Sequence, residues 1–388
     1  MTEILLWAGY FAVFAFLVHK GRSKDAVLSG SVGFGVQAFA YVATYISAVA
    51  LVGFGGLAHA YGLQMLLVAA GNVWFGTWAV YRFLAWPTRK WQERLGARTP
   101  AQLLGLGHGS PSLTRAMAFV FALFLGVYGS AVIKGAALLL AEILPVPVWA
   151  LIWLVSIIVG LTVFIGGLRG VLYTEAMQGV VMLVGMLMLV GAIFSKVGGP
   201  WEGMQALAAL PPSDLANNGF VSLSGGERGL FILSLVVVTS IAVWAQPQMM
   251  QRHFAIADPR QLKKTTPLAM FILTVLVGGA YFAAALSRLI LPEVASPDQV
   301  MPKLVQMLLP EFALHIFVLA IVSASLSTAT GIYHIAVSAL SEDLRGRPSN
   351  RLSWFTGIAI CVLVSGGCAQ IKGQLVALLC TTSWSIVG

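Results

Sequence analysis

Charged residues are scarce in this chain. Only 10% of its 388 residues are Asp, Glu, Lys or Arg, whereas 59% are hydrophobic and the mean hydropathy is +0.89. Soluble domains carry about 25% charged residues and cannot bury this much apolar surface in one core. The composition excludes an ordinary soluble protein. It predicts an all-α membrane protein, because an isolated strand in lipid would leave its backbone groups unpaired.

Cysteine is also scarce, and motifs that mark enzymes are missing. Cys361, Cys368 and Cys380 have neither CxxC nor Cys/His spacing, which argues against a disulfide framework and a zinc site. The GGER stretch at 225–228 lacks the spacing of a phosphate-binding loop, and no GxSxG or HExxH motif occurs. We therefore predict that the chain is not an enzyme and has no organic cofactor.

Ten apolar stretches, each bounded by Pro, Gly or charge, are long enough to cross a bilayer with some tilt. They run over 4–18, 28–58, 62–86, 113–141, 147–167, 172–195, 229–250, 267–291, 312–340 and 352–370. The first has basic residues after it rather than before it, so we expect a retained span and not a cleaved signal. An eleventh stretch begins near 374 and stops at Gly388, so we expect a last helix that is cut short.

The basic residues alternate between the predicted loops. With the N-terminus outside, 17 of the 23 basic residues fall in inside loops or at inside span ends, 5 fall outside, and Lys134 alone lies in the middle of a span. The inside group includes Arg252. This pattern predicts a multi-pass protein of the cytoplasmic (inner) membrane with its N-terminus outside. The formal net charge of +9 is thereby explained by the lipid bilayer, and no nucleic-acid partner is expected.

Two spans carry unusually many small or hydroxyl side chains. The second reads AYVATYISAVALVGFGG, and the ninth reads SASLSTATGIYHIAVSALSEDL. One interpretation is close packing, because small residues let helix backbones approach and hydroxyls bond to their own backbone. The other is a polar site inside the bundle. Chemistry alone leaves both open.

Four stretches together resemble the sodium:solute symporter family. They are ATYISA with the glycines and HAYGL after it, GGLRGVLYTEAMQGVVML at 166–183, AQPQMMQRHFA at 245–255, and SLSTATGIYHIAVSALSEDL at 325–344. The second is similar to the family signature that contains Thr-Asp-x-x-Gln, represented here by Glu175 and Gln178. The third is similar to the Gln-Pro stretch of proline symporters.

The resemblance implies a fold of two inverted repeats of five helices in a single membrane domain, 1–388. The first repeat would span 28–195 and the second 229–388, incomplete in its last helix, with 4–18 as an extra leading helix. Transporters of this kind bind ions and solutes near the midplane, where helices are broken. The glycine-rich second span and the Gln246–Pro247 pair in the seventh are the expected breaks, since proline removes a backbone donor.

The resemblance also implies a sodium site. Its carbonyl ligands would come from Ala43, Ile46 and Ala324, and its hydroxyl ligands from Ser327 and Thr328. Positions 324, 327 and 328 have the spacing i, i+3, i+4 and so share one helix face. Neutral oxygens suit a hard cation such as Na⁺.

Solute-binding residues are less well defined by the resemblance. The candidates on or near the broken helices, with one on the fourth span, are Tyr45, Ala50, Lys134, Trp244, Gln246 and Pro247. Ala50 stands where sugar symporters have Gln, which argues against sugars. A mid-span ammonium is costly and normally marks a pathway or a partner, so Lys134 either pairs with a solute carboxylate, replaces a cation, or extends its amine toward water.

The expected function is therefore sodium-coupled symport of a small organic solute, either an amino acid such as proline or a small carboxylate such as pantothenate. The alternative is a transporter-like membrane sensor module of a signalling histidine kinase, as in some members of this family. The oligomeric state is not predicted.

Overall fold

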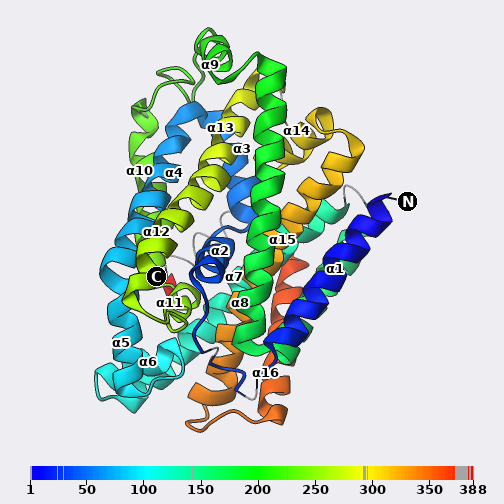
Figure 1. The fold of residues 1–388 in the computed structure, drawn as a ribbon. Helices are drawn as coiled ribbons and strands as arrows, with labels where there is room; N and C mark the ends of the chain where they lie inside the picture. Colours follow the sequence, from blue (N-terminus) through cyan, green and yellow to red (C-terminus); the bar gives the residue numbers. More distant parts are fainter. Residues whose placement is uncertain are drawn as a thin grey trace.

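The computed structural model describes residues 2–23, 25–28, 30–141, 144–224, 226–291, 294, 296–371, 383 and 386–387. Their regular structure is helical, with only isolated bridges between Val32 and Ile256 and between Ser213 and Ala216. Almost all of the predicted eleventh stretch, together with Lys24 and Lys372, lies outside the described residues. The chain is thus an all-helical protein, as its composition predicts (Figure 1).

The chain is a series of α-helices, several of which continue directly into a stretch of 3-10 or π-helix. The longer helices are α1 (Thr2–Gly21), α2 (Phe34–Tyr45), α3 (Phe54–Tyr61), α4 (Leu66–Val73), α5 (Trp86–Leu95), α6 (Pro100–Gly107), α7 (Pro111–Ala141), α8 (Val148–Val197), α9 (Pro200–Ala208), α10 (Gly229–Val236), α11 (Pro247–His253), α12 (Pro259–Leu273), α13 (Gly279–Leu286), α14 (Val300–Leu308), α15 (Glu311–Ser338) and α16 (Arg351–Ala369). The remaining elements are stretches of 3-10 or π-helix, of which η3, with 12 residues, is the longest: η1 (Val49–Gly53), η2 (Gly62–Met65), η3 (Trp74–Ala85), η4 (Gly226–Arg228), η5 (Val237–Ile241), η6 (Ala242–Trp244), η7 (Thr274–Gly278), η8 (Ser287–Leu289), η9 (Pro297–Gln299) and η10 (Ala339–Asp343).

Eight continuous helical stretches in the described part of the chain are long and apolar enough to cross a membrane, against ten predicted spans. The difference arises at two places. The helical run Val49–Leu95 joins the second half of the predicted span 28–58 to the span 62–86, and α8 contains the predicted spans 147–167 and 172–195 in one run. The run bends at Gly167, whose φ of +53° is accessible to glycine and whose missing side chain lets Ala26 pack against the backbone. The described residues therefore contain fewer continuous helical stretches than predicted spans.

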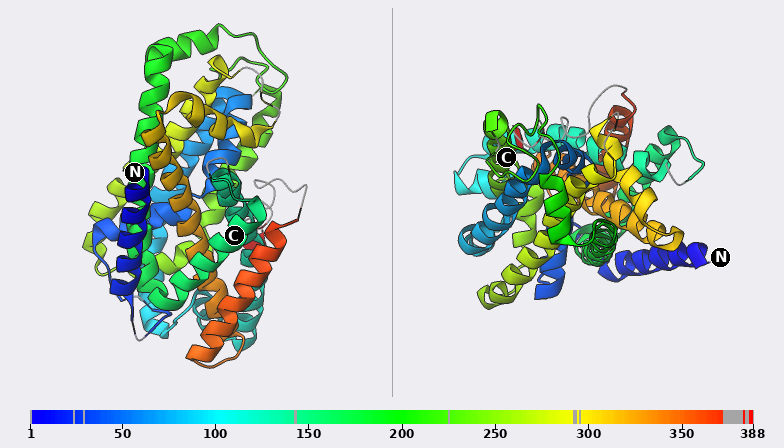
Figure 2. Two further views of the ribbon diagram at one scale, coloured as in Figure 1. Left: turned by 90° about the vertical axis from the view of Figure 1, so that its right-hand side faces the viewer. Right: turned by 90° about the horizontal axis from the view of Figure 1, so that it is seen from above.

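Helix α15 forms the centre of the bundle, and α1 lies at its edge. In an apolar segment of 18 residues from each helix, 78% of the residues are buried in α15 and its continuation, but only 17% are buried in α1. α15 packs against α8, α7, α2 and α16. Figure 1 and Figure 2 show α1 along the outside of the bundle. The hydroxyl-rich span of the sequence is therefore a core helix.

Candidate ion and solute site

The second predicted span is broken, as expected. α2 ends at Tyr45, Ile46 is extended with φ −99° and ψ 118°, and helix resumes at Val49. No proline lies nearby. Instead the Ser47 hydroxyl accepts a hydrogen bond from the Val49 backbone N–H at 3.2 Å, which caps the new helix. The carbonyls of Ala43 and Thr44, at the end of α2, face hydroxyls of a neighbouring helix.

That neighbour is α15, which meets the break with two hydroxyls. Ser327 Oγ lies 2.7 Å from the Ala43 carbonyl and 3.1 Å from the Ala324 carbonyl. Thr328 Oγ1 lies 3.2 Å from the Thr44 carbonyl and 3.3 Å from the Ile46 carbonyl. Both hydroxyl-bearing side chains are fully buried. The structure thus brings together the five residues predicted to bind sodium.

The oxygens of this cluster outnumber its hydrogens. Each hydroxyl carries a single hydrogen and can satisfy one carbonyl at a time, yet each has two carbonyls within reach. The cluster is buried, contains no charged side chain and has more oxygen lone pairs than hydrogens. Such an arrangement favours the binding of a small cation. Chemically, the crossing of α2 and α15 can hold an ion such as Na⁺.

A small cavity adjoins the break. It measures about 40 Å³ and is lined in part by Tyr45, Ile46, Ser47, Ala50 and Asn72. Further lining comes from Phe54, Tyr128, Val238, Thr239 and Tyr281. At roughly 10–15 Å³ for each water, this space holds only about three waters, so a solute needs the surrounding helices to move apart. Two of the predicted solute residues, Tyr45 and Ala50, are in its wall.

Asn72 organises one side of this cavity and was not predicted from the sequence. Its Oδ1 accepts hydrogen bonds from Tyr45 at 3.0 Å, Thr239 at 2.9 Å and Ser240 at 3.0 Å. The Tyr45 hydroxyl also lies 2.6 Å from the Thr239 carbonyl. The signal available in the sequence was a lone Asn within the apolar stretch 62–86. These contacts tie the α2 break to η5.

The second break lies at Gln246–Pro247, as predicted. Gln246 is extended with ψ 118°, and Pro247 takes the first position of α11, where its missing N–H costs nothing. The Gln246 carbonyl accepts from the backbone N–H groups of Met249 and Met250, and its side chain accepts from Gln248. Trp244, just before the break, donates from Nε1 to the Phe75 carbonyl at 2.8 Å.

Lys134 is directed elsewhere. Its Nζ donates to the Ile371 carbonyl, just past the end of α16, at 2.8 Å. Lys134 follows Tyr128 by six residues on α7, which is about 240° around the helix. The face of α7 that carries Tyr128 lines the cavity, and Lys134 lies on another face.

The prediction that Arg252 lies in an inside loop is wrong. Arg252 belongs to α11 and is fully buried, as is Glu175 of α8, with which its guanidinium forms an ion pair. Arg252 Nε also donates to Thr44 Oγ1 at 3.1 Å. Topology reasoning counts every basic residue as a loop residue, and it fails here because α11 packs inside the bundle. Gln178, the other signature residue, is fully buried one turn after Glu175.

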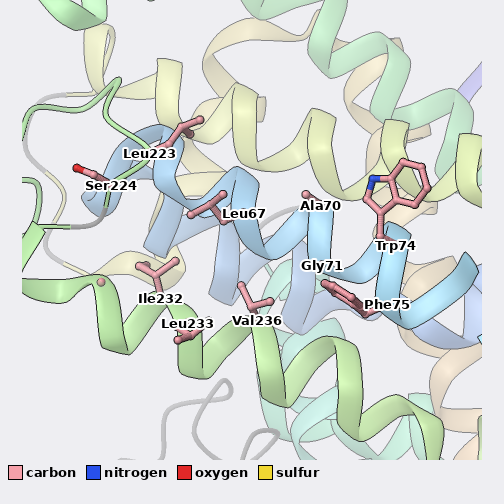
Figure 3. A pocket seen from close by; sticks show the side chains of 11 residues that line it. Leu67, Ala70, Gly71, Trp74, Phe75, Leu223, Ser224, Ile232, Leu233 and Val236 are labelled. Carbon is pink, nitrogen blue, oxygen red and sulfur yellow. The ribbon is translucent and has the colours of Figure 1, made fainter. Parts of the chain in front are cut away.

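Two further features lie away from the α2–α15 crossing. A cavity of about 390 Å³ between α4 and α10 is lined by apolar side chains such as Leu67, Trp74 and Ile232, and Trp74 is 54% exposed (Figure 3). Its walls offer almost no polar group to orient a solute.

Glu3, Glu311 and His315 lie close enough together to hold a metal ion, but His315 Nδ1 already accepts a hydrogen bond from Trp7.

The fold is that of a solved transporter. A Na⁺-coupled sialic acid symporter in a substrate-bound, outward-open state superposes with a TM-score of 0.81 at 15% identity, over 95% of this chain and 80% of the other. At that identity the likeness establishes the fold alone.

Sequence relatives are symporters. The sodium/pantothenate symporter of Haemophilus influenzae is 27% identical over 85% of this chain and 69% of its own length, and that of Escherichia coli is 28% identical over 81% and 65%. A high-affinity proline transporter of Bacillus subtilis is 25% identical over 88% and 71%. The chain therefore spans about two thirds of the length of these relatives.

The sequence model of the Sodium:solute symporter family matches residues 27–365, which is most of the chain. This family comprises membrane transporters and not enzymes, in agreement with the missing catalytic motifs. The family model, the sequence relatives and the fold agree. This multi-pass membrane protein belongs to the sodium:solute symporter family.

Proposed function

We propose that this chain is a sodium-coupled symporter that carries a small organic solute across the cytoplasmic membrane by alternating access. The observation that carries the proposal is the crossing of α2 and α15, where four carbonyls surround two hydroxyls in a buried place. Na⁺ bound there would replace the hydroxyl hydrogens as the partner of the carbonyls. The ligands would be Ala43, Ile46, Ala324, Ser327 and Thr328.

The architecture that supports this function is a single membrane domain of two inverted repeats, 28–195 and 229–388, preceded by a leading helix. The breaks at Ile46 and Gln246 support it, because each falls in the first helix of its proposed repeat. The loops rich in Lys and Arg would face the cytoplasm, which places the N-terminus outside.

The solute we propose is a small polar molecule with a carboxylate, such as pantothenate or proline. Two of the relatives are named as a sodium/pantothenate symporter and a proline transporter. The cavity wall offers neutral hydrogen-bonding groups from Tyr45, Asn72 and Thr239. The Ile46 residue belongs both to the cation cluster and to the cavity wall, so the counter-charge of a carboxylate would be the bound Na⁺ rather than Lys134.

Uptake into proteoliposomes tests the proposal. Labelled pantothenate, proline and acetate are offered with an inward gradient of Na⁺ or of choline. We expect one solute to accumulate only with Na⁺. We expect Ser327→Ala combined with Thr328→Val to reduce that uptake at least about 100-fold, because it removes two of the five proposed Na⁺ ligands and a polar group that contacts a charge contributes about 1.5–3 kcal/mol.

Ser338→Ala is the matched control, because this α15 hydroxyl donates only to the His334 carbonyl of its own helix. Uptake of the same solute without Na⁺, or an unaffected double variant, would contradict the proposal. Solute binding without accumulation would instead favour the sensor function.

A further inference from the structure

One face of α15 runs from the cation cluster, formed by Ser327, Thr328 and the carbonyls around them, toward the end of the bundle that carries Arg98. Ser327, Gly331, His334 and Ser338 recur every three or four residues and so share that face. At Gly331 the missing side chain makes room for Arg252 and Thr44, and His334 Nε2 lies 2.7 Å from the Ala26 carbonyl. This face therefore packs on α2, on α11 and on the segment that leads into α2.

Arg98, between α5 and α6, bridges the segment that leads into α2 and the η10 continuation of α15. Its two Nη atoms donate to both oxygens of Asp25 at 2.9 and 3.0 Å, and its Nε donates to Glu342 Oε1 at 2.7 Å. Asp25 precedes α2, and Glu342 lies in η10, the continuation of α15. Arg98 thus closes the seam between α2 and α15 at the end of the bundle opposite α9 (Figure 1).

Neighbours of Arg98 strengthen the α15 side of this bridge. Thr99 Oγ1 donates to Asp343 Oδ1 at 2.9 Å, and Gln102 Nε2 donates to the same oxygen at 2.8 Å. The Thr99 hydroxyl in addition accepts from the Gln102 N–H and caps α6. α6 is therefore fixed to η10 as a unit, and Arg98 is the arm that reaches from this unit to Asp25.

The bridge is built to be opened, in contrast to the Arg252–Glu175 pair. The side chains of Arg98 and Asp25 are 32% and 37% exposed, so water can replace the bonds between these two residues. The Glu342 end of the bridge is 3% exposed, and Arg252 and Glu175 have no exposure. Burial alone would raise the pKa of the Asp25 carboxyl, but the hydrogen bonds and charge of Arg98 outweigh burial and lower it. Asp25 is therefore ionised at neutral pH, and its pair with Arg98 is an ion pair.

We propose that Arg98 is a positioning residue for transport: its bridge from Asp25 to Glu342 latches the cytoplasmic seam between α2 and α15 shut, and it opens when the ion leaves toward the cytoplasm. The proposal rests on the proposed function. Bound Na⁺ pulls α2 and α15 together at one level of the seam, and the Arg98 bridge holds them together at another. Na⁺ binding and the latch are therefore expected to stabilise the same closed arrangement.

The accessibility of a cysteine in the seam tests the latch without any transport. Ser338→Cys is placed in the full chain with Cys361, Cys368 and Cys380 changed to Ala, and the chain is reconstituted in nanodiscs. Ser338 is 1% exposed and lies between His334 and Glu342 on the seam face. The rate of alkylation by a water-soluble maleimide is measured with and without Na⁺.

We expect slow alkylation that Na⁺ slows further. Arg98→Ala should raise the rate at least about 10-fold, and Arg98→Lys should give an intermediate rate because it keeps the charge but loses the two-pronged contact. Arg89→Ala is the matched control: it also removes a basic residue from this end, but Arg89 pairs with Glu93 within α5. We expect no change in that variant.

The outcomes separate the latch from the proposed function. Equal rates in the Arg98→Ala and Arg89→Ala proteins would overturn the latch. If Na⁺ does not change the alkylation rate but Arg98→Ala raises it, the latch is supported and sodium coupling is contradicted. If Arg98→Ala does not fold, Asp25→Asn removes the same bridge from its more exposed side, and an unchanged rate in that variant would also overturn the proposal.

Discussion

The two broken helices of this bundle are interrupted in different ways. The first break, after Tyr45, contains no proline and is held open by Ser47 and by the hydroxyls of α15. The second, at Gln246, is followed by Pro247, and the helix after it is anchored by the buried pair of Arg252 and Glu175. One break is surrounded by neutral oxygens, and the other carries a permanent cation.

This difference indicates which break can exchange an ion. A cation that enters the first break finds carbonyls and hydroxyls without a charge of their own, and it can leave again. The second break already contains a guanidinium that cannot leave. Thr44 joins the two, because its carbonyl faces Thr328 and its hydroxyl accepts from Arg252. We infer that the second break positions the first.

Arg252→Ala should have the largest effect on this comparison. It leaves the Glu175 carboxylate buried without its partner, which costs about 3–5 kcal/mol. We expect a markedly lower thermal unfolding temperature in detergent. The double variant Arg252→Gln with Glu175→Gln should recover much of the loss, because it removes both charges. A double variant less stable than Arg252→Ala would contradict the anchoring role.

Tyr45→Phe should have an intermediate effect. It removes the hydroxyl that contacts Asn72 and the Thr239 carbonyl, and so loosens the link between the first break and η5. A hydrogen bond of this kind contributes about 0.5–1.5 kcal/mol. We expect a modest fall in unfolding temperature and a higher KM for the solute. Unchanged values of both would show that the two breaks are not linked through Tyr45.

Pro247→Ala should have the smallest effect. If the ion pair rather than the proline holds α11 in place, alanine at the first helical position changes the free energy of unfolding by less than about 1 kcal/mol. The measurement is the same thermal unfolding as for Arg252→Ala. A loss as large as that of Arg252→Ala would mean that the second break depends on its proline.

The cation cluster was predictable because the family resemblance supplied both its carbonyls and its hydroxyls. The sequence supported it, since positions 324, 327 and 328 share one face of a helix with too many polar groups for lipid. The Gln246–Pro247 break was predictable from the proline. The burial of Arg252 was not, because its partner Glu175 is 77 residues away in the chain and only the tertiary structure brings them together. The same holds for Asn72, whose partners lie on α2 and η5, and for the direction of Lys134.

The most direct test of the account is stabilisation by the ion itself. A ligand that binds only the folded state stabilises it by RT ln(1 + [ligand]/Kd), about 2.7 kcal/mol at 100 times Kd. We predict that NaCl, but not choline chloride at equal ionic strength, raises the unfolding temperature of the purified chain, and that Ser327→Ala with Thr328→Val abolishes the rise while Ser338→Ala preserves it. An equal rise in the double variant, or none in the unchanged chain, would contradict a sodium site at the crossing of α2 and α15.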